Sequence, residues 1–170
     1  TLPPEIGQLT ALKSISLSSN TLSGTIPSEI RALENIETFD VSSNFLSDNL
    51  PDVFNELVYL KDFDVSLNYL SGSLPPTLLT SANVLNKLNI SGNVFGIDLS
   101  LPEDLGSMTS LRSLDLSTNQ FIGSIPESIG ELENLVELRM DQNFLTGALP
   151  VSVTQLTNME HFSAAGNSIT

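Results

Sequence analysis

Three aspartates in the first half of the chain have the types and spacing best suited to chemistry. Asp40 and Asp64 are 24 residues apart, and Asp62 precedes Asp64 by two residues. Carboxylate oxygens are the ligands that calcium takes in proteins, so three carboxylates brought together could hold such a cation. Lys61 and Lys87 lie in the same stretch and could neutralise the aspartates instead. We expect this second arrangement and predict no metal site.

Side chains that catalyse group transfer are scarce. The chain has no cysteine, which excludes thiolate catalysis and zinc-thiolate sites. Its single histidine, His161, would need an aspartate and a nucleophile beside it to form a serine triad. Asp141 could approach it from a neighbouring strand, but the sequence has no G-x-S-x-G stretch and no phosphate-binding glycine loop. We therefore predict no enzyme activity and no cofactor.

The aspartates and the histidine stand on a sequence repeat that runs through the whole chain. The stretch Leu111–Pro126, LRSLDLSTNQFIGSIP, returns every 24 to 26 residues, and its clearest marker is an asparagine after a short apolar run. The marker asparagines are Asn20, Asn44, Asn68, Asn93, Asn119, Asn143 and Asn167. A fixed period of this size indicates a solenoid, in which each copy buries its apolar face against its neighbours.

Each copy predicts a strand, a turn and a tight helical segment. Residues eight, five and three positions before every asparagine are apolar, and residues 114–117 (LDLS) alternate with the period of two that is typical of a strand. An asparagine amide can both donate to and accept from a turn backbone, so stacked copies would form a ladder of these side chains. After the proline, apolar residues return every three positions, as at Ile129, Leu132 and Leu135, which favours 3-10 turns.

The half-motif Leu-x-Gly-x-Ile/Leu-Pro resembles the plant-type, 24-residue subclass of the leucine-rich repeat. It occurs at residues 22–27, 70–75 and 145–150, and with a leading phenylalanine at 121–126. The resemblance implies an α/β solenoid, a right-handed superhelix with a concave parallel β-sheet and convex 3-10 or short helical turns. We expect a single domain of about seven repeats over residues 1–170, with both ends cutting through a repeat, as in part of a longer protein.

Two copies depart from this pattern. Asp48 stands where other copies have glycine. The fourth copy, irregular around residues 80–102, carries two extra residues within Val94–Leu101 and one more between Thr80 and Val84. Because a solenoid extrudes extra residues without breaking the stack, we expect residues 94–101 to project as a loop, either as a functional element or as a tolerated insertion.

The charges divide unevenly between the two expected faces. The net charge is −14, and the eight residues ending at each marker asparagine hold five of the six basic residues against eight carboxylates. The rest of the chain holds Arg31 alone against twelve carboxylates. This acidic coat favours solubility, and the absence of a basic strip disfavours nucleic acid as a partner.

Outward positions of the expected strands supply the candidate ligand contacts, because they vary between copies. The candidates on the concave strip are Asp40, Asp62, Asp64, Lys87, Asp115, Glu137, Arg139 and Asp141. Phe45, Tyr69 and Phe144 follow the asparagines on the rim, and the first two could stack because they lie on adjacent copies. A serine column at 18, 42, 66, 91 and 117 is expected to be scaffold, and Asn89-Ile90-Ser91 is a candidate glycosylation sequon.

These observations predict a non-catalytic recognition module that binds a protein, peptide or glycan through its concave face. The resemblance includes receptor-like proteins and favours an extracellular or cell-surface location, although a cytoplasmic one is open. No apolar run reaches the roughly 20 residues that cross a bilayer. A structural or adhesive component that packs side by side with other chains is the main alternative, and a surface binder of the inhibitor or ice-binding kind ranks after it.

Overall fold

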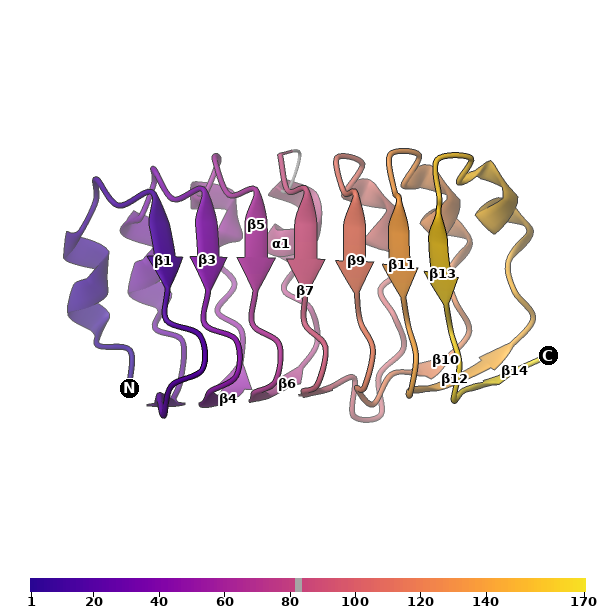
Figure 1. Cartoon of the computed structure of the whole chain (residues 1–170), viewed down its shortest axis with the longest axis horizontal. Helices are drawn as coiled ribbons and strands as arrows, with labels where there is room; N and C mark the ends of the chain where they lie inside the picture. The colour runs from indigo at the N-terminus through magenta and orange to yellow at the C-terminus, as the bar shows by residue number, and fades with distance from the viewer. Residues whose placement is uncertain (82–83) are drawn as a thin grey trace.

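The computed structural model describes residues 1–81 and 84–170 and shows a stack of coils with one strand of a long sheet in each. Seven parallel strands form this sheet in chain order: β1 (Ser14–Ser16), β3 (Thr38–Asp40), β5 (Asp62–Asp64), β7 (Lys87–Asn89), β9 (Ser113–Asp115), β11 (Glu137–Arg139) and β13 (His161–Ser163). The strands lie side by side from one end of the molecule to the other (Figure 1). The predicted parallel sheet is confirmed.

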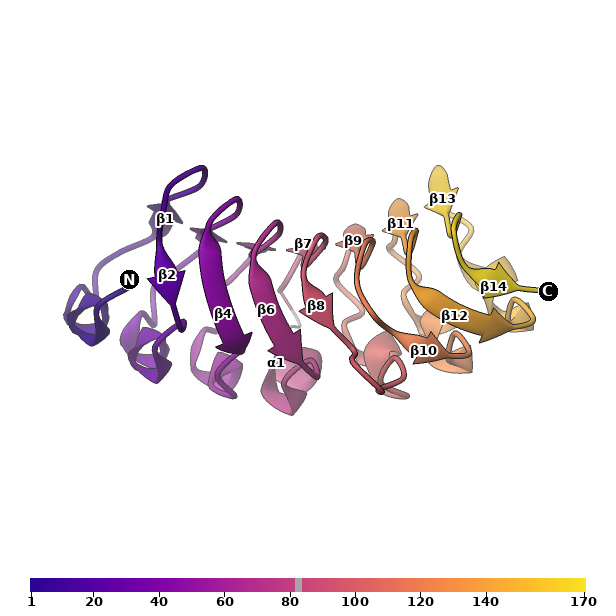
Figure 2. The same cartoon turned by 90° about the horizontal axis from the view of Figure 1, so that it is seen from below.

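Short helical turns line the opposite side of the stack. They are η1 (Pro4–Gln8), η2 (Ser28–Ala32), η3 (Phe54–Glu56), α1 (Pro76–Ser81), η4 (Leu105–Ser107), η5 (Glu127–Glu131) and η6 (Val151–Gln155), of which α1 is an α-helix and the others are 3-10 helices. The stack curves with these turns on its outer side and the seven-stranded sheet on its inner side (Figure 2). We call the inner sheet the concave sheet.

Two further sheets, which the sequence did not lead us to expect, connect the concave sheet to the convex turns. β2 (Ser23–Gly24), β4 (Phe45–Asn49), β6 (Tyr69–Gly72) and β8 (Val94–Phe95) form the first flank sheet, and β10 (Ile122–Gly123), β12 (Phe144–Gly147) and β14 (Ser168–Ile169) form the second. They are seen from outside in Figure 2. The extra residues of the fourth copy separate them, and an isolated bridge from Ser100 to Ile122 is the pairing across the gap.

The marker asparagines form the predicted ladder inside the turns. Asn68 is 5% exposed, and its Nδ2 donates to the carbonyls of Val41, Val65 and Ser66, each at 3.1 Å. Its Oδ1 accepts the Leu46 N–H at 2.9 Å. The amide therefore bonds backbone groups of its own copy and of the preceding one. It accepts the buried Leu46 N–H and shares the Val41 and Val65 carbonyls with the amides of Asn44 and Asn93.

The inward apolar positions form one continuous core. Leu114 and Leu138 are fully buried, as are Phe39 and Phe63, whose rings lie 5.5 Å apart between adjacent copies. The core is less complete in the first and last copies, where Leu12, Leu17, Met159 and Ala164 are half-buried. Phe162 is 39% exposed in the last copy, where no further coil of this chain covers it.

The two irregular copies keep the stack intact. Asp48 adopts φ 65°, the same left-handed conformation as Gly24 and Gly72 in the neighbouring copies. In the fourth copy, residues 97–100 are exposed while Phe95 and Leu101 remain buried, so the projecting loop is confirmed but is shorter than predicted. The other extra residue, between Thr80 and Val84, falls at positions 82–83, outside the described residues.

Candidate functional site

The concave sheet places the candidate contacts in two outward columns. Strand register aligns Asp40, Asp64, Asn89, Asp115 and Arg139 in one row and Asp62, Lys87, Ser113, Glu137 and His161 in the next. Both rows match the predicted columns. Asp141 follows β11 by two residues. Every candidate on the concave strip therefore lies on one continuous face of about seven strands' width.

Several of these carboxylates also hold the turn that follows their strand. Oδ1 of Asp64 accepts the backbone N–H of Ser66 at 3.1 Å and the Ser66 hydroxyl at 2.6 Å. The same pair of bonds joins Asp40 to Ser42, Asn89 to Ser91 and Asp115 to Ser117. The serine column is thus scaffold, as expected. The Asp/Asn-x-Ser spacing could have identified these bonds in the sequence, because such side chains commonly bond the backbone two residues on.

Asp141 accepts the corresponding hydrogen bonds from the turn of the next copy. Its Oδ1 accepts hydrogen bonds from the Ser163 hydroxyl and, at 2.8 Å, from the N–H of Ala165. The position in the last copy that corresponds to Asp115 is Ser163, which cannot accept in the same way. A neighbouring strand therefore supplies the missing carboxylate.

Ion pairs neutralise part of the acidic strip. Lys87 Nζ lies 3.3 Å from Asp64 Oδ2, as predicted. Lys61, expected to neutralise the aspartates, instead bonds Glu37 at 2.7 Å, with Lys13 3.8 Å away from the same carboxylate. The hydrogen bond from Lys61 lowers the pKa of Glu37 and raises the pKa of Lys61. Lys61 thus bonds a carboxylate on the preceding copy, and of the three aspartates it is Asp62 whose charge acts on Lys61.

Arg139 and Glu137 form a further ion pair, within one strand. Arg139 Nη2 lies 2.7 Å from Glu137 Oε1, and Nε donates to the same oxygen at 2.8 Å. The other Glu137 oxygen accepts the Ser113 hydroxyl at 3.0 Å. These contacts fix the arginine over β11, and its side chain is 54% exposed.

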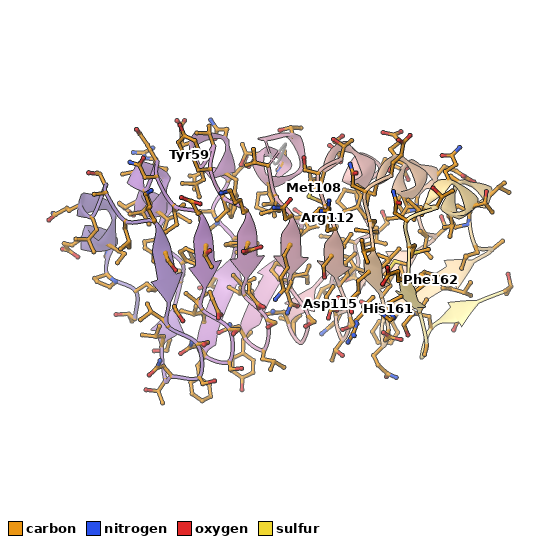
Figure 3. All side chains as sticks on the ribbon, turned by 45° about the horizontal axis from the view of Figure 1, so that its top comes forward. Tyr59, Met108, Arg112, Asp115, His161 and Phe162 are labelled. Atoms are coloured by element: carbon orange, nitrogen blue, oxygen red, sulfur yellow. The ribbon has the colours of Figure 1, made fainter. Side chains whose placement is uncertain are left out.

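Other charged groups on the concave sheet point to solvent. In the described part of the chain, the side chains of Asp62 and Arg112 make no hydrogen bond or ion pair. Arg112 directly precedes β9 and Asp115 is the last residue of β9, so the two lie toward opposite ends of that strand (Figure 3). Among residues 1–81 and 84–170, no group of three or more His, Cys, Asp or Glu side chains is arranged to hold a metal ion.

A hollow of about 410 Å³ lies at the last strands, lined by Arg139, Asp141, Glu160, His161, Phe162 and Ser163. It brings together the residue types of a serine triad, and Figure 3 labels His161 and Phe162 there. The order of the hydrogen bonds is wrong for catalysis, because the Ser163 hydroxyl donates to Asp141 and is not aligned on the histidine.

The predicted aromatic stack is present on the first flank sheet. The rings of Phe45 and Tyr69 lie 6.2 Å apart at an interplanar angle of 20°. Phe144 occupies the corresponding position on β12 and is 62% exposed. At the opposite edge of the concave sheet, Val58 and Tyr59 are also exposed, a feature that sequence reasoning missed (Figure 3). In three other copies the place of Tyr59 holds Asn35, Asn134 or Asn158, whose amides bond the preceding turn.

The candidate glycosylation residue lies in the middle of the concave sheet. Asn89 Nδ2 donates to Asp64 Oδ2 at 3.0 Å, and its Oδ1 accepts from Ser91. Both ends of its amide are therefore engaged, and a glycan there would stand between Asp64 and Asp115. Glycosylation of Asn89 stays a prediction.

Comparison with protein families agrees with this architecture. The family model described as Leucine Rich Repeat matches residues 11–33, 35–57 and 110–132. Together with the stacked parallel strands and 3-10 turns, these matches decide the assignment. The chain is a leucine-rich-repeat protein of the plant type.

Solved leucine-rich-repeat structures align over nearly the whole chain. The plant peptide hormone receptor RGFR1 in complex with RGF2 is 32% identical, with a TM-score of 0.83 over 100% of this chain. The ectodomain of the Arabidopsis thaliana receptor kinase GASSHO1/SCHENGEN3 in complex with CASPARIAN STRIP INTEGRITY FACTOR 2 is 30% identical, with a TM-score of 0.76 over 99%. The Arabidopsis receptor kinase HAESA in complex with the peptide hormone IDA and the co-receptor SERK1 is 26% identical, with a TM-score of 0.81 over 99%.

This leucine-rich-repeat chain spans 30%, 23% and 32% of those three chains, respectively. No curated protein matches it in a sequence comparison. Over residues 1–81 and 84–170, the structure contains no helix with the length and apolar character needed to cross a membrane.

Proposed function

We propose that this chain is a non-catalytic recognition module of an extracellular or cell-surface protein, and that it binds a peptide or protein segment along the concave sheet. The main support is that the residue types differ between the inward and the outward side of the concave sheet. Inward positions are apolar in every copy, whereas the outward column Ser14, Thr38, Asp62, Lys87, Ser113, Glu137 and His161 changes charge and size from copy to copy. A scaffold alone needs no such variation.

The contacts differ in how available they are to a ligand. The side chains of Asp62 and Arg112 make no hydrogen bond among the described residues, and Arg139 keeps half of its side chain exposed. Asp40 and Asp115 each use Oδ1 for their own turn, and no hydrogen bond in the described residues uses Oδ2. Asp64 accepts four hydrogen bonds and is the least available. We infer that Asp40, Asp62, Asp115 and Arg139 contribute more to ligand affinity than Asp64, with Lys87, Glu137 and Asp141 beside them.

The similar structures support this proposal by analogy. Two of the three compared proteins are described as bound to a peptide hormone or as peptide hormone receptors, and all three are plant receptors. Their concave leucine-rich-repeat architecture is shared by this chain, which supports an extracellular location and a peptide ligand. The analogy rests on fold and moderate identity, so the site itself must be tested residue by residue.

A phage-displayed library of random dodecapeptides, selected on the purified chain, provides the probe. Selected peptides are synthesised and titrated by calorimetry into the wild-type chain, Asp62→Lys, Arg139→Glu and the control Glu34→Lys. Glu34 is exposed beside a convex turn, so its variant changes the net charge by the same amount as Asp62→Lys, away from the concave sheet. We expect at least a tenfold loss of affinity with either concave variant and less than a twofold change with the control.

Equal affinity for all four proteins, or no selected peptide, would overturn the proposal. The second result, together with concentration-dependent self-association in sedimentation, would favour the structural or adhesive alternative. Circular dichroism of each variant confirms that the fold is retained before its affinity is compared.

A further inference from the structure

The aromatic pair on the first flank sheet lies outside the proposed concave site. Phe45 and Tyr69 are the first residues of β4 and β6, where Leu46 and Leu70 beside them point into the core. Phe45 is 49% exposed and Tyr69 57% exposed. Aromatic side chains of this size normally bury much of their surface, so two half-exposed neighbouring rings are an unpartnered apolar feature.

Leu67 is a further exposed apolar residue, two positions before Tyr69. It is 59% exposed in the turn before Tyr69 and adopts φ 53°. The other copies have Ser19, Ser43, Gly92, Thr118, Gln142 or Gly166 at this place. The Leu67 side chain lies over Gly92 of the next copy, where an added Cβ would be 2.6 Å from Leu67 Cδ2. We call Phe45, Leu67 and Tyr69 the flank patch.

The solenoid itself does not require these rings. The positions that correspond to Phe45 and Tyr69 in the other copies are Thr21, Val94, Gln120, Phe144 and Ser168. Copies two and three are therefore the neighbouring pair in which two rings stand side by side. Phe144 is a ring exposed to 62% that stacks on no other ring among residues 1–81 and 84–170, which makes it a control.

The residues around the flank patch favour a positively charged partner. Residues 41–60 and 65–86 contain no lysine or arginine. Asp48 is exposed on the same strand as Phe45 and is in register with Leu70, next to Tyr69. The nearest cations along the chain, Lys61 and Lys87, are bonded to Glu37 and Asp64 on the concave sheet. A cation that reaches the patch thus meets ring faces and the carboxylate of Asp48.

A guanidinium group fits this surface better than other charged side chains do. It is planar, stacks on aromatic faces and is weakly hydrated, and a cation over an exposed ring gains about 0.5–1 kcal/mol. We propose that the flank patch is a second docking surface, separate from the concave sheet, for an extended arginine-containing segment of a partner protein. The arginine stacks on Phe45 and Tyr69, apolar residues cover Leu67, and Asp48 attracts the remaining positive charge.

The probe is a blocked Gly-Arg-Gly-Arg-Gly-Arg-Gly peptide, titrated into the ¹⁵N-labelled chain and followed by amide chemical shifts at low salt. We expect shifts that concentrate at residues 44–49 and 66–72. Two rings at the cited energy correspond to a fivefold to thirtyfold loss of affinity in the Phe45→Ser/Tyr69→Ser double variant, by about 1.4 kcal/mol per factor of ten. Tyr69→Phe should bind as the wild type does.

Three comparisons make the result specific to the flank patch. Phe144→Ser and the concave variant Asp62→Asn should each change the affinity less than twofold, and a peptide with glutamine in place of arginine should bind at least fivefold more weakly. Wild-type affinity in the double variant, equal binding of the glutamine peptide, or no shifts at the patch would each overturn the inference. Because Asp62 belongs to the concave sheet, failure here leaves the proposed concave function to its own test.

Discussion

Asn89 donates a side-chain hydrogen bond to Asp64 across two neighbouring strands, with 3.0 Å between Nδ2 and Oδ2. Lys87 Nζ lies 3.3 Å from the same oxygen, while Oδ1 accepts two bonds from Ser66. Asp64 is therefore held by four donors in the middle of the concave sheet. The residue that sequence spacing marked as a ligand contact is first of all a part that fixes the sheet and its turn.

Replacing Asn89 with aspartate tests this arrangement. Asn89→Asp removes the donor and places a third carboxylate between Asp64 and Asp115, in register with both. Like charges directly opposite each other are unfavourable, so we expect a loss of about 1–2 kcal/mol in the free energy of unfolding. Urea denaturation at low salt and at about 0.5 M salt measures it, and the loss should shrink at high salt. Asn89→Ser removes the donor without adding charge and should show no such salt dependence.

The buried asparagine ladder should be among the most sensitive features of the fold. Asn68→Ala leaves one backbone N–H and three carbonyls without their amide partner, and we expect it to cost about 2–4 kcal/mol. Asn20 is exposed, and its amide bonds Leu17 and Ser18 alone among the described residues. Asn20→Ala should therefore cost less than half as much in the same urea titration. Equal costs would show that the ladder contributes little beyond the turn of each copy.

Asp48 offers a simple way to stabilise the chain. Its φ of 65° is a conformation that glycine adopts freely and that other residues adopt at a cost. Asp48→Gly should raise the free energy of unfolding by about 0.5–1 kcal/mol. Asp48→Asn removes the charge and keeps a side chain, so it separates relief of backbone strain from relief of charge repulsion. The reverse change, Gly72→Asp, should destabilise, because an added Cβ would lie 2.5 Å from Asn49 Oδ1.

Much of this fold follows from the period of the sequence, and the reasons for the exceptions are physical. The apolar positions before Asn68 or Asn119 can point only inward, so the strands, their register and the ladder could be predicted. The flank sheets could not, because Phe45–Asn49 has no alternating apolar pattern and its pairing arises from the stacking of neighbouring turns. The partners of charged side chains could not be predicted from the sequence either. The spacing of Lys61 from the aspartates does not show that Glu37, on the preceding copy, lies within 2.7 Å of its ammonium group.

Acid should lower the free energy of unfolding, because it protonates the hydrogen-bonded carboxylates of Asp52 and Glu37. Hydrogen bonds from the side chain and backbone of Thr77 lower the pKa of Asp52 below its ordinary 3.8, and Lys61 lowers the pKa of Glu37 below 4.5. A carboxyl group with a lowered folded pKa stabilises the fold above its unfolded pKa, and this stabilisation is lost as the pH falls through the folded pKa. Stability should therefore decline as the pH falls below about 4.5.

Asp52→Asn isolates one of these groups. The variant keeps an oxygen for Thr77 but loses the charged acceptor, which makes the stronger hydrogen bond. We expect a lower urea midpoint than wild type at pH 7 and equal midpoints at about pH 2, where the wild-type carboxyl is protonated as well. Glu34→Gln makes the same change in net charge at an exposed carboxylate and serves as the control. A difference that persists unchanged at the acidic pH would assign the effect to packing.

The loop of the fourth copy can be shortened without loss of the core. Ile97 is 49% exposed and Asp98 is exposed, whereas Leu101 is 1% exposed and Phe95 fully buried. Deleting residues 97 and 98 restores the 24-residue spacing between Asn93 and Asn119 and removes little buried surface. We expect the Tm to change by less than about 3 °C, since 1 kcal/mol corresponds to about 2–4 °C in a chain of this size. Leu101→Ala creates a cavity and should cost about 2–5 kcal/mol. If the deletion lowers the Tm as much as Leu101→Ala does, the loop is part of the packed structure, and its exposed residues hold the two flank sheets together across the bridge from Ser100 to Ile122.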